Sequence, residues 1–265
     1  MSYPPQRQTM CTIVILNRPG HDWPVLIAAN RDERLDRPWK KPGAHWPDRP
    51  EVVAGLDVLA GGSWLGINAT GVVAAALNRQ GTLGPAEGKR SRGELVLDAL
   101  DHSDAADAAE TLGAIDPRAF RPFNLVIADN RDAFLLCHRN GAGGAAITVE
   151  PLSEGLSMVT ALERDDPRSP RIRTYRPRFL AAPVPDPDRG DWTAWEGLLA
   201  DRNREAGADP TDSLFIDPVP AGGADQFGTT SSSLIALPAI DRLERRPVFR
   251  FASGPPETWR WEDVA

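Results

Sequence analysis

Two stretches decide the fold: Cys11-Thr12-Ile13-Val14-Ile15-Leu16 and Val25-Leu26-Ile27-Ala28-Ala29-Asn30-Arg31-Asp32-Glu33. Both are apolar on their two alternating faces, which is typical of strands that are covered on both sides. The segment between them contains Pro19, Gly20 and Pro24, so we predict an antiparallel hairpin. Because such a hairpin brings the start of one strand beside the end of the other, Cys11 should lie next to Asn30–Glu33.

The composition bounds the class of protein. The chain has 265 residues, enough for one large domain or two small ones. Its 37 acidic and 30 basic residues argue against a nucleic-acid partner, and no apolar run reaches the roughly 20 residues of a membrane span. Residues 1–10 lack a secretory signal, and we expect a disordered tail there. With only Cys11 and Cys137 we expect no disulfide framework and a reduced, cytoplasmic setting.

The segments after the hairpin predict further strands. Residues 34–50 are rich in proline, and we expect a long ordered loop, held by its tryptophans, of the kind that forms a lid. Three short strands should follow, at residues 52–59, 63–68 and 72–78. Together with the opening hairpin they would form a meander of about five strands.

Helices and a second group of strands follow. Ser91-Arg92-Gly93-Glu94 is a capping box, and Ser103 should cap a second helix. The further expectations are strands at 124–128, 133–138, 145–149 and 156–159, turns at 129–132 and 140–144, a Pro- and Arg-rich connector at 163–178, a helix at 191–204, and closing strands at 228–237 and 247–252. Because the helices are clustered, we predict an α+β fold in one domain over 11–265. Its two stacked, mainly antiparallel sheets would be flanked by helices in a four-layer α-β-β-α sandwich.

The polar residues of the hairpin have alternative interpretations. Cys11 is either a nucleophile or a small buried apolar side chain. Asn30–Glu33 would hold a substrate carboxylate, orient a nucleophile or form structural ion pairs. Asn78, at the end of an apolar strand, would donate to an oxyanion or cap a turn.

Other polar groups carry weaker signals. The four histidines share no ligand spacing, so we expect surface or loop positions, no metal site and no cofactor. Gly61-Gly62-Ser63 lacks the lysine of a phosphate-binding loop. The arginines between 164 and 178 should form a solvated segment, with attraction of an anionic ligand as the alternative.

An ordered series of motifs resembles one family. The motifs are Met10-Cys11, Ala29-Asn30-Arg31-Asp32-Glu33, Gly62-Ser63-Trp64-Leu65-Gly66-Ile67, Ala76-Leu77-Asn78, Ser91-Arg92-Gly93-Glu94-Leu95-Val96 and Phe123-Asn124-Leu125-Val126. This series resembles the NRDE family, whose eukaryotic members are called transport and Golgi organisation proteins. The resemblance implies the N-terminal nucleophile (Ntn) hydrolase fold. Within that fold it is similar to the cysteine amidohydrolases that include choloylglycine hydrolases and penicillin V acylases.

The resemblance also implies roles for single residues. Cys11 would be the nucleophile with its own free α-amine as base, supported by Asp32 and Arg31, and Asn78 would stabilise the oxyanion. The expected substrate-binding residues are Asn30, Glu33, Trp64 and Thr160.

Three positions depart from the amidohydrolase pattern. Ala29 stands where those enzymes have an arginine, unless Arg31 substitutes for it. Ala161 stands where a second oxyanion asparagine is expected, and Thr230 where many family members have an arginine. Loss of an oxyanion donor costs about 100- to 1,000-fold in rate.

Two functions remain open at this point. The first is hydrolysis of a small amide by Cys11, which needs a free α-amine and therefore translation from Met10 with removal of that methionine, or cleavage of the tail. The second is a non-catalytic binding or trafficking protein on the same scaffold. It would hold a small amphipathic ligand, such as haem or an acyl-lipid, under the 34–50 loop.

Overall fold

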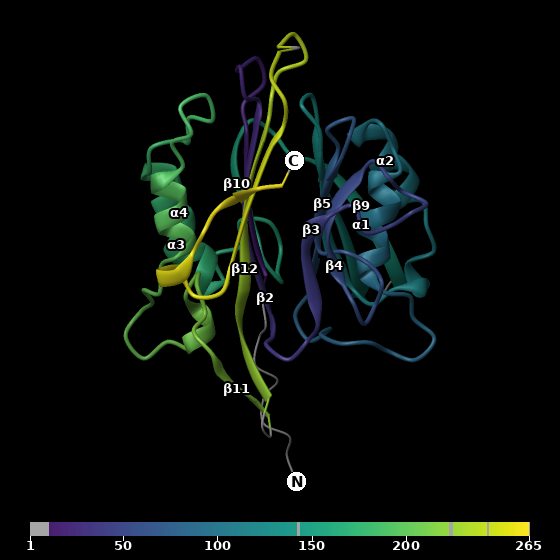
Figure 1. The fold of residues 1–265 in the computed structure, drawn as a ribbon. Helices are drawn as coiled ribbons and strands as arrows, with labels where there is room; N and C mark the ends of the chain where they lie inside the picture. Colours follow the sequence, from purple (N-terminus) through teal and green to yellow (C-terminus); the bar gives the residue numbers. More distant parts are fainter. Residues whose placement is uncertain (1–10, 142–143, 223–224, 243, 265) are drawn as a thin grey trace.

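The fold is a stack of two sheets with helices outside. The computed structural model describes residues 11–141, 144–222, 225–242 and 244–264. In these residues two antiparallel sheets face each other, and helices cover both outer faces (Figure 1). The predicted α-β-β-α sandwich is therefore confirmed. The predicted tail at 1–10 and part of the predicted turn at 140–144 lie outside the described residues.

The first sheet contains the opening hairpin. Its strands run in the order β10 (Gly155–Val159), β1 (Thr12–Asn17), β2 (Val25–Arg34), β12 (Asp225–Leu237), β13 (Val248–Ser253) and β14 (Glu262–Asp263), and β11 (Val219–Gly222) pairs with β12. Thr12 pairs with Asn30 and Asn17 pairs with Val25. The predicted hairpin is thus confirmed, and it lies in the middle of its sheet.

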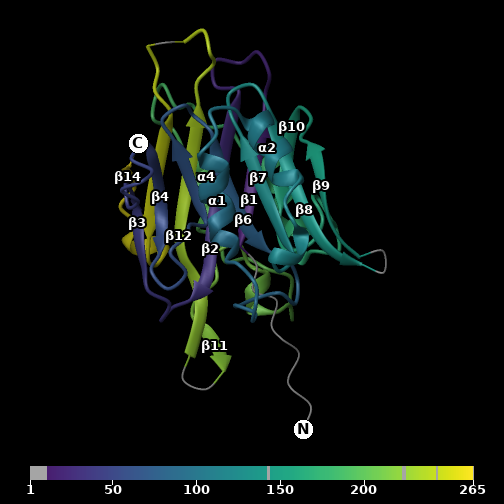
Figure 2. The same cartoon turned by 90° about the vertical axis from the view of Figure 1, so that its right-hand side faces the viewer.

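The second sheet is formed by the middle of the chain (Figure 2). Its order is β3 (Trp39–Gly43), β4 (Val52–Asp57), β5 (Leu65–Asn68), β6 (Val73–Asn78), β7 (Phe123–Ala128), β8 (Ala133–Gly141) and β9 (Gly144–Pro151). The predicted five-stranded meander is wrong, because the opening hairpin pairs with β10 and β12 and not with these strands.

The expected loop at 34–50 is also partly wrong. Strand β2 continues to Arg34, and Trp39–Gly43 forms strand β3 at the edge of the second sheet. The pairing register with β4 shifts between Lys40 and Gly43, around Pro42. An edge strand tolerates a proline because the missing N–H removes no bond from an interior ladder.

Four α-helices and three 3₁₀ segments are found in the described residues. Helices α1 (Arg92–Leu100) and α2 (Ala105–Gly113) cover the second sheet, and α3 (Pro170–Ala181) and α4 (Thr193–Leu199) cover the first. The 3₁₀ segments are η1 (Pro117–Ala119), η2 (Pro210–Asp212) and η3 (Pro256–Thr258). None of the helices in the described part of the chain is long and apolar enough to cross a bilayer.

The helix starts confirm some expectations and correct others. The capping box of α1 is present, with the Ser91 side chain accepting from the Gly93 N–H and the Glu94 carboxylate from the Ser91 N–H. Helix α2 is capped by Asp104 and not by Ser103. The helix expected at 191–204 is shorter, because α4 ends at Leu199.

The predicted connector at 163–178 is wrong. Ser169 caps helix α3 and Pro170 occupies its first turn, where a missing N–H costs nothing. The arginines there are not all solvated, because Arg171 is fully buried. His138 corrects the surface assignment of the histidines in the same way: it lies on β8, only 1% exposed, with its ring 5.5 Å from that of Phe123.

Candidate functional site

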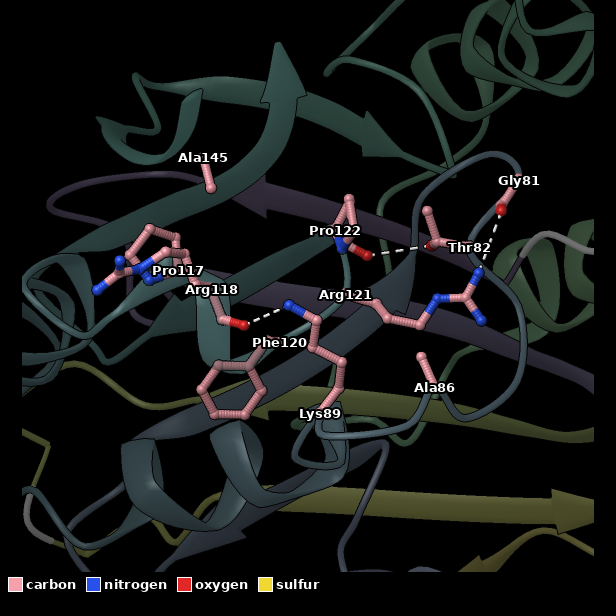
Figure 3. A pocket seen from close by; sticks show the side chains of 10 residues that line it. All are labelled: Gly81, Thr82, Ala86, Lys89, Pro117, Arg118, Phe120, Arg121, Pro122 and Ala145. Carbon is pink, nitrogen blue, oxygen red and sulfur yellow. Dashed lines mark hydrogen bonds between the residues drawn. The ribbon is translucent and has the colours of Figure 1, made fainter. Parts of the chain in front are cut away.

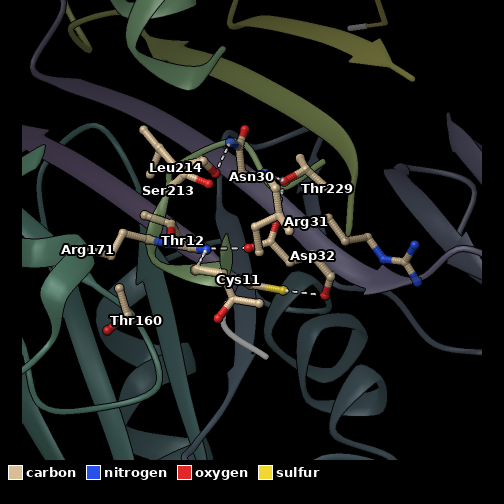
Figure 4. A network of polar contacts seen from close by, with 12 residues as sticks. Cys11, Thr12, Asn30, Arg31, Asp32, Thr160, Arg171, Ser213, Leu214 and Thr229 are labelled. Atoms are coloured by element: carbon tan, nitrogen blue, oxygen red, sulfur yellow. Dashed lines mark hydrogen bonds and ion pairs between the residues drawn. The ribbon is translucent and has the colours of Figure 1, made fainter. Parts of the chain in front are cut away.

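Cys11 lies at the open end of the hairpin, opposite its turn, and immediately precedes β1. Its Sγ donates to the main-chain carbonyl of Asp32 at 3.6 Å (Figure 4). The predicted proximity of Cys11 to Asn30–Glu33 is therefore confirmed. Desolvation first, and then the negative charge of Asp32, raise the pKa of the Cys11 thiol to about 12. In this environment the sulfur is a protonated thiol, so its activation requires a change in its surroundings.

Alternation along β2 divides the polar cluster between the two faces of the sheet. Ala29 packs in the core between the sheets, and Arg31 follows two residues later, on the same face as Cys11. Asn30 points to the other face, where its amide donates to the carbonyls of Leu199 and Leu214 at 3.0 and 2.9 Å. Hydrogen bonds from Asn30 therefore anchor β2 to the last residue of α4 and to Leu214, on the helix side of the sheet. Arg31 and Cys11 lie on the opposite face, between the two sheets.

Asp32 is the centre of a buried network on the helix side. Its Oδ2 lies 2.7 Å from Arg171 Nη1 of α3, and both side chains are 0% exposed. Thr229 donates to Asp32 Oδ1 at 2.6 Å, and Arg171 also donates to Thr12 Oγ1 at 2.8 Å (Figure 4). Burial raises the pKa of Asp32, and the charge of Arg171 and the bond from Thr229 oppose that rise. The network therefore holds the Asp32 carboxylate on the helix side of β2, at the residue whose main-chain carbonyl accepts from the Cys11 thiol.

Sequence reasoning missed Arg171. The arginine-rich segment predicts a solvated side chain, yet the buried Arg171 guanidinium also donates to the Thr211 carbonyl at 2.7 Å. The available signal was Ser169-Pro170, a helix start that would have placed Arg171 in the first turn of a helix rather than in a connector.

Arg31 lies over the indole of Trp64, on the interior side of the sheet. The guanidinium carbon is 4.3 Å from the ring centroid, and Nη1 donates to Thr230 Oγ1 at 3.1 Å. Glu33 approaches the same guanidinium at 4.0 Å. Burial lowers the pKa of Arg31, and the charge of Glu33 opposes that change. Arg31 therefore supplies a cation on the face between the sheets, where the methyl side chain of Ala29 carries no charge.

A bulge in β12 brings the threonines to this site. Thr229 pairs with Asp32 and Ser231 pairs with Arg31, so Thr230 is an extra residue between them. Its hydroxyl also donates to the Arg31 carbonyl at 3.1 Å. Thr229 thus bonds to Asp32 and Thr230 to Arg31, so two adjacent threonines of β12 contact two adjacent residues of β2.

A small cavity adjoins the thiol. It has a volume of about 20 Å³, and its lining includes Cys11, Arg31, Trp64, Leu77 and Ser233. Such a volume holds about one water molecule. A substrate acyl group therefore enters only if a lining side chain moves.

The remaining expected site residues lie outside this lining. Asn78 is half-buried at the end of β6, after Leu77, whose side chain packs between the sheets. Thr160 is buried, with its hydroxyl 3.4 Å from that of Ser169 at the start of α3. Ala161 is buried as well. Among the described residues there is no cluster of three or more His, Cys, Asp or Glu side chains that would hold a metal ion.

Comparison with known sequences gives one family. The model of the family described as "Transport and Golgi organisation 2" matches residues 10–179. The mouse Transport and Golgi organization 2 homolog is 32% identical over 143 residues, and the human protein is 33% identical over 141. Each alignment covers 50% of this chain and 50% of the relative. The chain thus spans about half the length of these curated relatives.

Two solved structures resemble the fold. A Caenorhabditis elegans ortholog of the N-acylethanolamine-hydrolyzing acid amidase has a TM-score of 0.52 at 13% identity, over 88% of this chain and 96% of that chain. A variant of the conjugated bile acid hydrolase from Clostridium perfringens has a TM-score of 0.51 at 12% identity, over 96% of this chain and 92% of that chain. Both neighbours are Ntn hydrolases, and at these identities the likeness shows the fold alone.

Proposed function

Because the chain belongs to the Transport and Golgi organisation 2 family and has the Ntn-hydrolase fold, we propose that it is a cysteine amidohydrolase of a small amide. The observation that carries the proposal is the position of Cys11 next to Asp32, whose carboxylate is ion-paired with Arg171. A thiol before a central strand, with a fixed carboxylate behind it, suits nucleophilic attack by the first residue of a mature chain.

In the proposed reaction the Cys11 sulfur attacks the amide carbonyl. The α-amine of Cys11 accepts the thiol proton and returns it to the leaving amine as the carbon–nitrogen bond breaks. Water then attacks the resulting thioester, which releases the carboxylic acid and restores the thiol. Asp32 would hold the α-amine in place, and Arg171 and Thr229 orient its carboxylate and oppose the rise in its pKa that burial causes.

Other residues would bind the substrate or stabilise charge. Arg31 supplies a cation on the Cys11 side of the sheet, where it lies over Trp64. Glu33 borders the same guanidinium, and Asn78 would reach the oxyanion from the end of β6. We assign Asn30 and Thr160 supporting roles behind the strand, because their polar groups bond to the helix-side layer.

The proposal requires a chain that begins at Cys11. In the longer chain the main-chain nitrogen of Cys11 is an amide and cannot act as a base, and the pKa of the thiol is about 12. A free, neutral α-amine would accept the thiol proton, and the ammonium group so formed would stabilise the thiolate beside it. Exposure of this amine would therefore activate the protein.

The test compares two forms of the protein. A chain released at Cys11 by a site-specific protease and a chain that keeps residues 1–10 are incubated with N-acylethanolamines, conjugated bile acids and an electrophilic β-lactone. We expect hydrolysis or a covalent mass increase only for the released chain. Cys11→Ala should abolish both, whereas the control Cys137→Ala, at the second free cysteine, which is buried, should keep them. Equal labelling of Cys11→Ala and the unmodified sequence would refute the proposal.

A second candidate is a binding protein for a small amphipathic ligand. Ala161, in place of a second oxyanion asparagine, favours this function, because a methyl group donates no hydrogen bond. Haem and acyl-CoA would then raise the midpoint of thermal unfolding in proportion to the logarithm of their concentration. An unchanged midpoint with both ligands would remove this candidate.

A further inference from the structure

A second, much larger cavity lies at the end of the second sheet, outside the Cys11 site (Figure 3). Its volume is about 530 Å³, which is in the range of small-molecule sites. The walls come from the segment between β6 and α1, from η1 and the residues before β7, and from Ala145 of β9. Segments of three separate parts of the chain thus meet around one cleft.

The cleft is basic although the chain is acidic. Lys89, Arg118 and Arg121 line it, and no aspartate or glutamate is among its lining residues. The whole chain, in contrast, has a formal net charge of −7. Asp116 offsets part of this charge, because it pairs with Arg118 at 3.0 Å. The excess positive charge therefore comes from Lys89 and Arg121.

These two cations bond to neutral partners. Arg121 Nη1 donates to the carbonyls of Leu83 and Gly84 at 2.7 and 3.0 Å, and Lys89 Nζ donates to the Arg118 carbonyl. A carbonyl orients a cation but does not neutralise it. The side chains are thus held in place while their charge stays available to a ligand.

Arg92 adds a third positive charge directly behind the wall. Its Nη1 donates to the Thr82 carbonyl at 2.8 Å and to the Pro122 carbonyl at 3.2 Å, and Thr82 and Pro122 both line the cleft. Desolvation first, and then the charge of Arg121, lower the pKa of Arg92 to about 10. Like charges held together in this way repel each other, and a bound anion would relieve the repulsion.

The lining also offers apolar surface. Ala86, Pro117 and Ala145 line the cleft with exposed or half-buried side chains, whereas the ring of Phe120 is only 2% exposed. A ligand that fits both features has a negatively charged group and a compact apolar body.

We propose that this cleft is a binding site for a small organic anion, a carboxylate, phosphate or sulfonate with an apolar body. The charged group would lie between Lys89 and Arg121, and the apolar body against Pro117 and Ala145. The proposal does not depend on catalysis at Cys11, because binding is measured without turnover.

The test uses phenyl phosphate as the probe and calorimetric titration of the full chain at low ionic strength. We expect saturable binding that weakens as salt is added, and binding of the uncharged analogue phenol that is at least about ten-fold weaker. Lys89→Glu should weaken phenyl phosphate binding by about ten-fold or more. The matched control Lys41→Glu, which changes an exposed lysine on the edge strand β3, should bind like the unmodified chain.

Three results would overturn the proposal. They are no saturable binding at millimolar phenyl phosphate, equal affinity for phenol, and equal affinity of the Lys89→Glu and Lys41→Glu variants. Circular dichroism of both variants establishes that they are folded. A rise in the thermal midpoint with phenyl phosphate, present in the control and lost in Lys89→Glu, gives a second readout.

Discussion

At the scale of single residues, the Arg31–Asp32 pair shows how one strand supplies two environments. Arg31 lies over Trp64 between the sheets, whereas Asp32 meets Arg171 under helix α3. Successive residues of a strand point to opposite faces, so neighbouring charges need not neutralise each other. Each charge instead finds its partner in a different layer of the molecule.

The ion pair between Asp32 and Arg171 predicts a large stability effect. Arg171→Met would leave Asp32 charged and buried without its cation, and we expect a loss of about 3–5 kcal/mol in the free energy of unfolding. The control Arg173→Met changes an arginine of the same helix that is 46% exposed and pairs with a glutamate that is 60% exposed, and it should cost less than about 1 kcal/mol. Urea unfolding of both variants measures the difference; similar losses would contradict the buried pair.

The same variant predicts a pH dependence with a definite sign. Burial already raises the folded-state pKa of Asp32, and removal of Arg171 would raise it further. A carboxyl whose pKa is higher in the folded state than in the unfolded state stabilises the fold when protonated, and this stabilisation is lost as the pH rises through the folded-state value. The deficit of Arg171→Met should therefore be largest at neutral pH and shrink as the pH falls toward 4. A deficit that grows in acid would contradict this.

The sequence predicts part of this site, for a physical reason. The proximity of Cys11 to Asp32 follows from an antiparallel hairpin, whose geometry is local and periodic. The contact between Asp32 and Arg171 joins positions 139 residues apart, and no local pattern encodes such a contact. The strand pattern places Arg31 on the same face as Ala29, where amidohydrolases have an arginine. Its stacking on Trp64 depends on the packing of one sheet on the other, which no pattern along the strand predicts.

At the scale of elements, two glycines fix how α1 meets the second sheet. A Cβ at Gly62 would lie 2.4 Å from the Gly93 main-chain carbon, and one at Gly93 would lie 3.0 Å from the Ser63 nitrogen. The Ser63 N–H donates to the Gly93 carbonyl at 3.0 Å across this contact. The start of the helix therefore rests on the backbone before β5.

This close approach predicts opposite results for two glycine substitutions. Gly62→Ala should destabilise the protein by about 1–3 kcal/mol or more, because backbone must move to admit the methyl group. Gly197→Ala, in helix α4 with open space around its Cβ position, should instead stabilise by up to about 1 kcal/mol. Thermal unfolding of the two variants checks the signs, and a harmless Gly62→Ala would argue against the contact.

Element prediction succeeded where signals are local and failed where proline was misinterpreted. The Ser91 capping box and the strands from β4 to β9 follow from caps, turns and alternation. Their prolines predict a loop at Trp39–Gly43 and a connector at Pro170–Ala181. In the structure Pro42 lies in an edge strand and Pro170 in a first helical turn, both positions that tolerate a missing N–H.

At the scale of the whole molecule, the stacking of the sheets is the feature that sequence order hides. Both sheets contain strands with the same apolar alternation, so neighbours along the chain resemble partners in space. The hairpin instead pairs with β10 and β12, and the paired residues are at least 138 positions apart between β1 and β10 and at least 193 positions apart between β2 and β12. Pairing over such distances is decided by the packing of the sheets on each other.

The shared core between the sheets predicts where stability resides. Ile27 is 1% exposed in that core. Its substitution by alanine should lower the free energy of unfolding by about 2–5 kcal/mol. Ile240→Ala is the matched control, because that side chain is 64% exposed and its loss should be close to zero. Guanidinium unfolding gives both values; equal losses would show that the interface between the sheets contributes little.

The bulge at Thr230 makes β12 one residue longer than the part of β2 that it pairs with. Deletion of this one residue would leave Ser231 opposite Arg31 and Thr229 opposite Asp32, now as consecutive pairs of a regular ladder. It would remove the hydroxyl that accepts from the Arg31 guanidinium and donates to the Arg31 carbonyl. Natural or engineered variation should therefore accept a gap here far more readily than in the regularly paired stretch from Ser231 to Leu237, where a gap would shift the register and exchange the two faces of the strand.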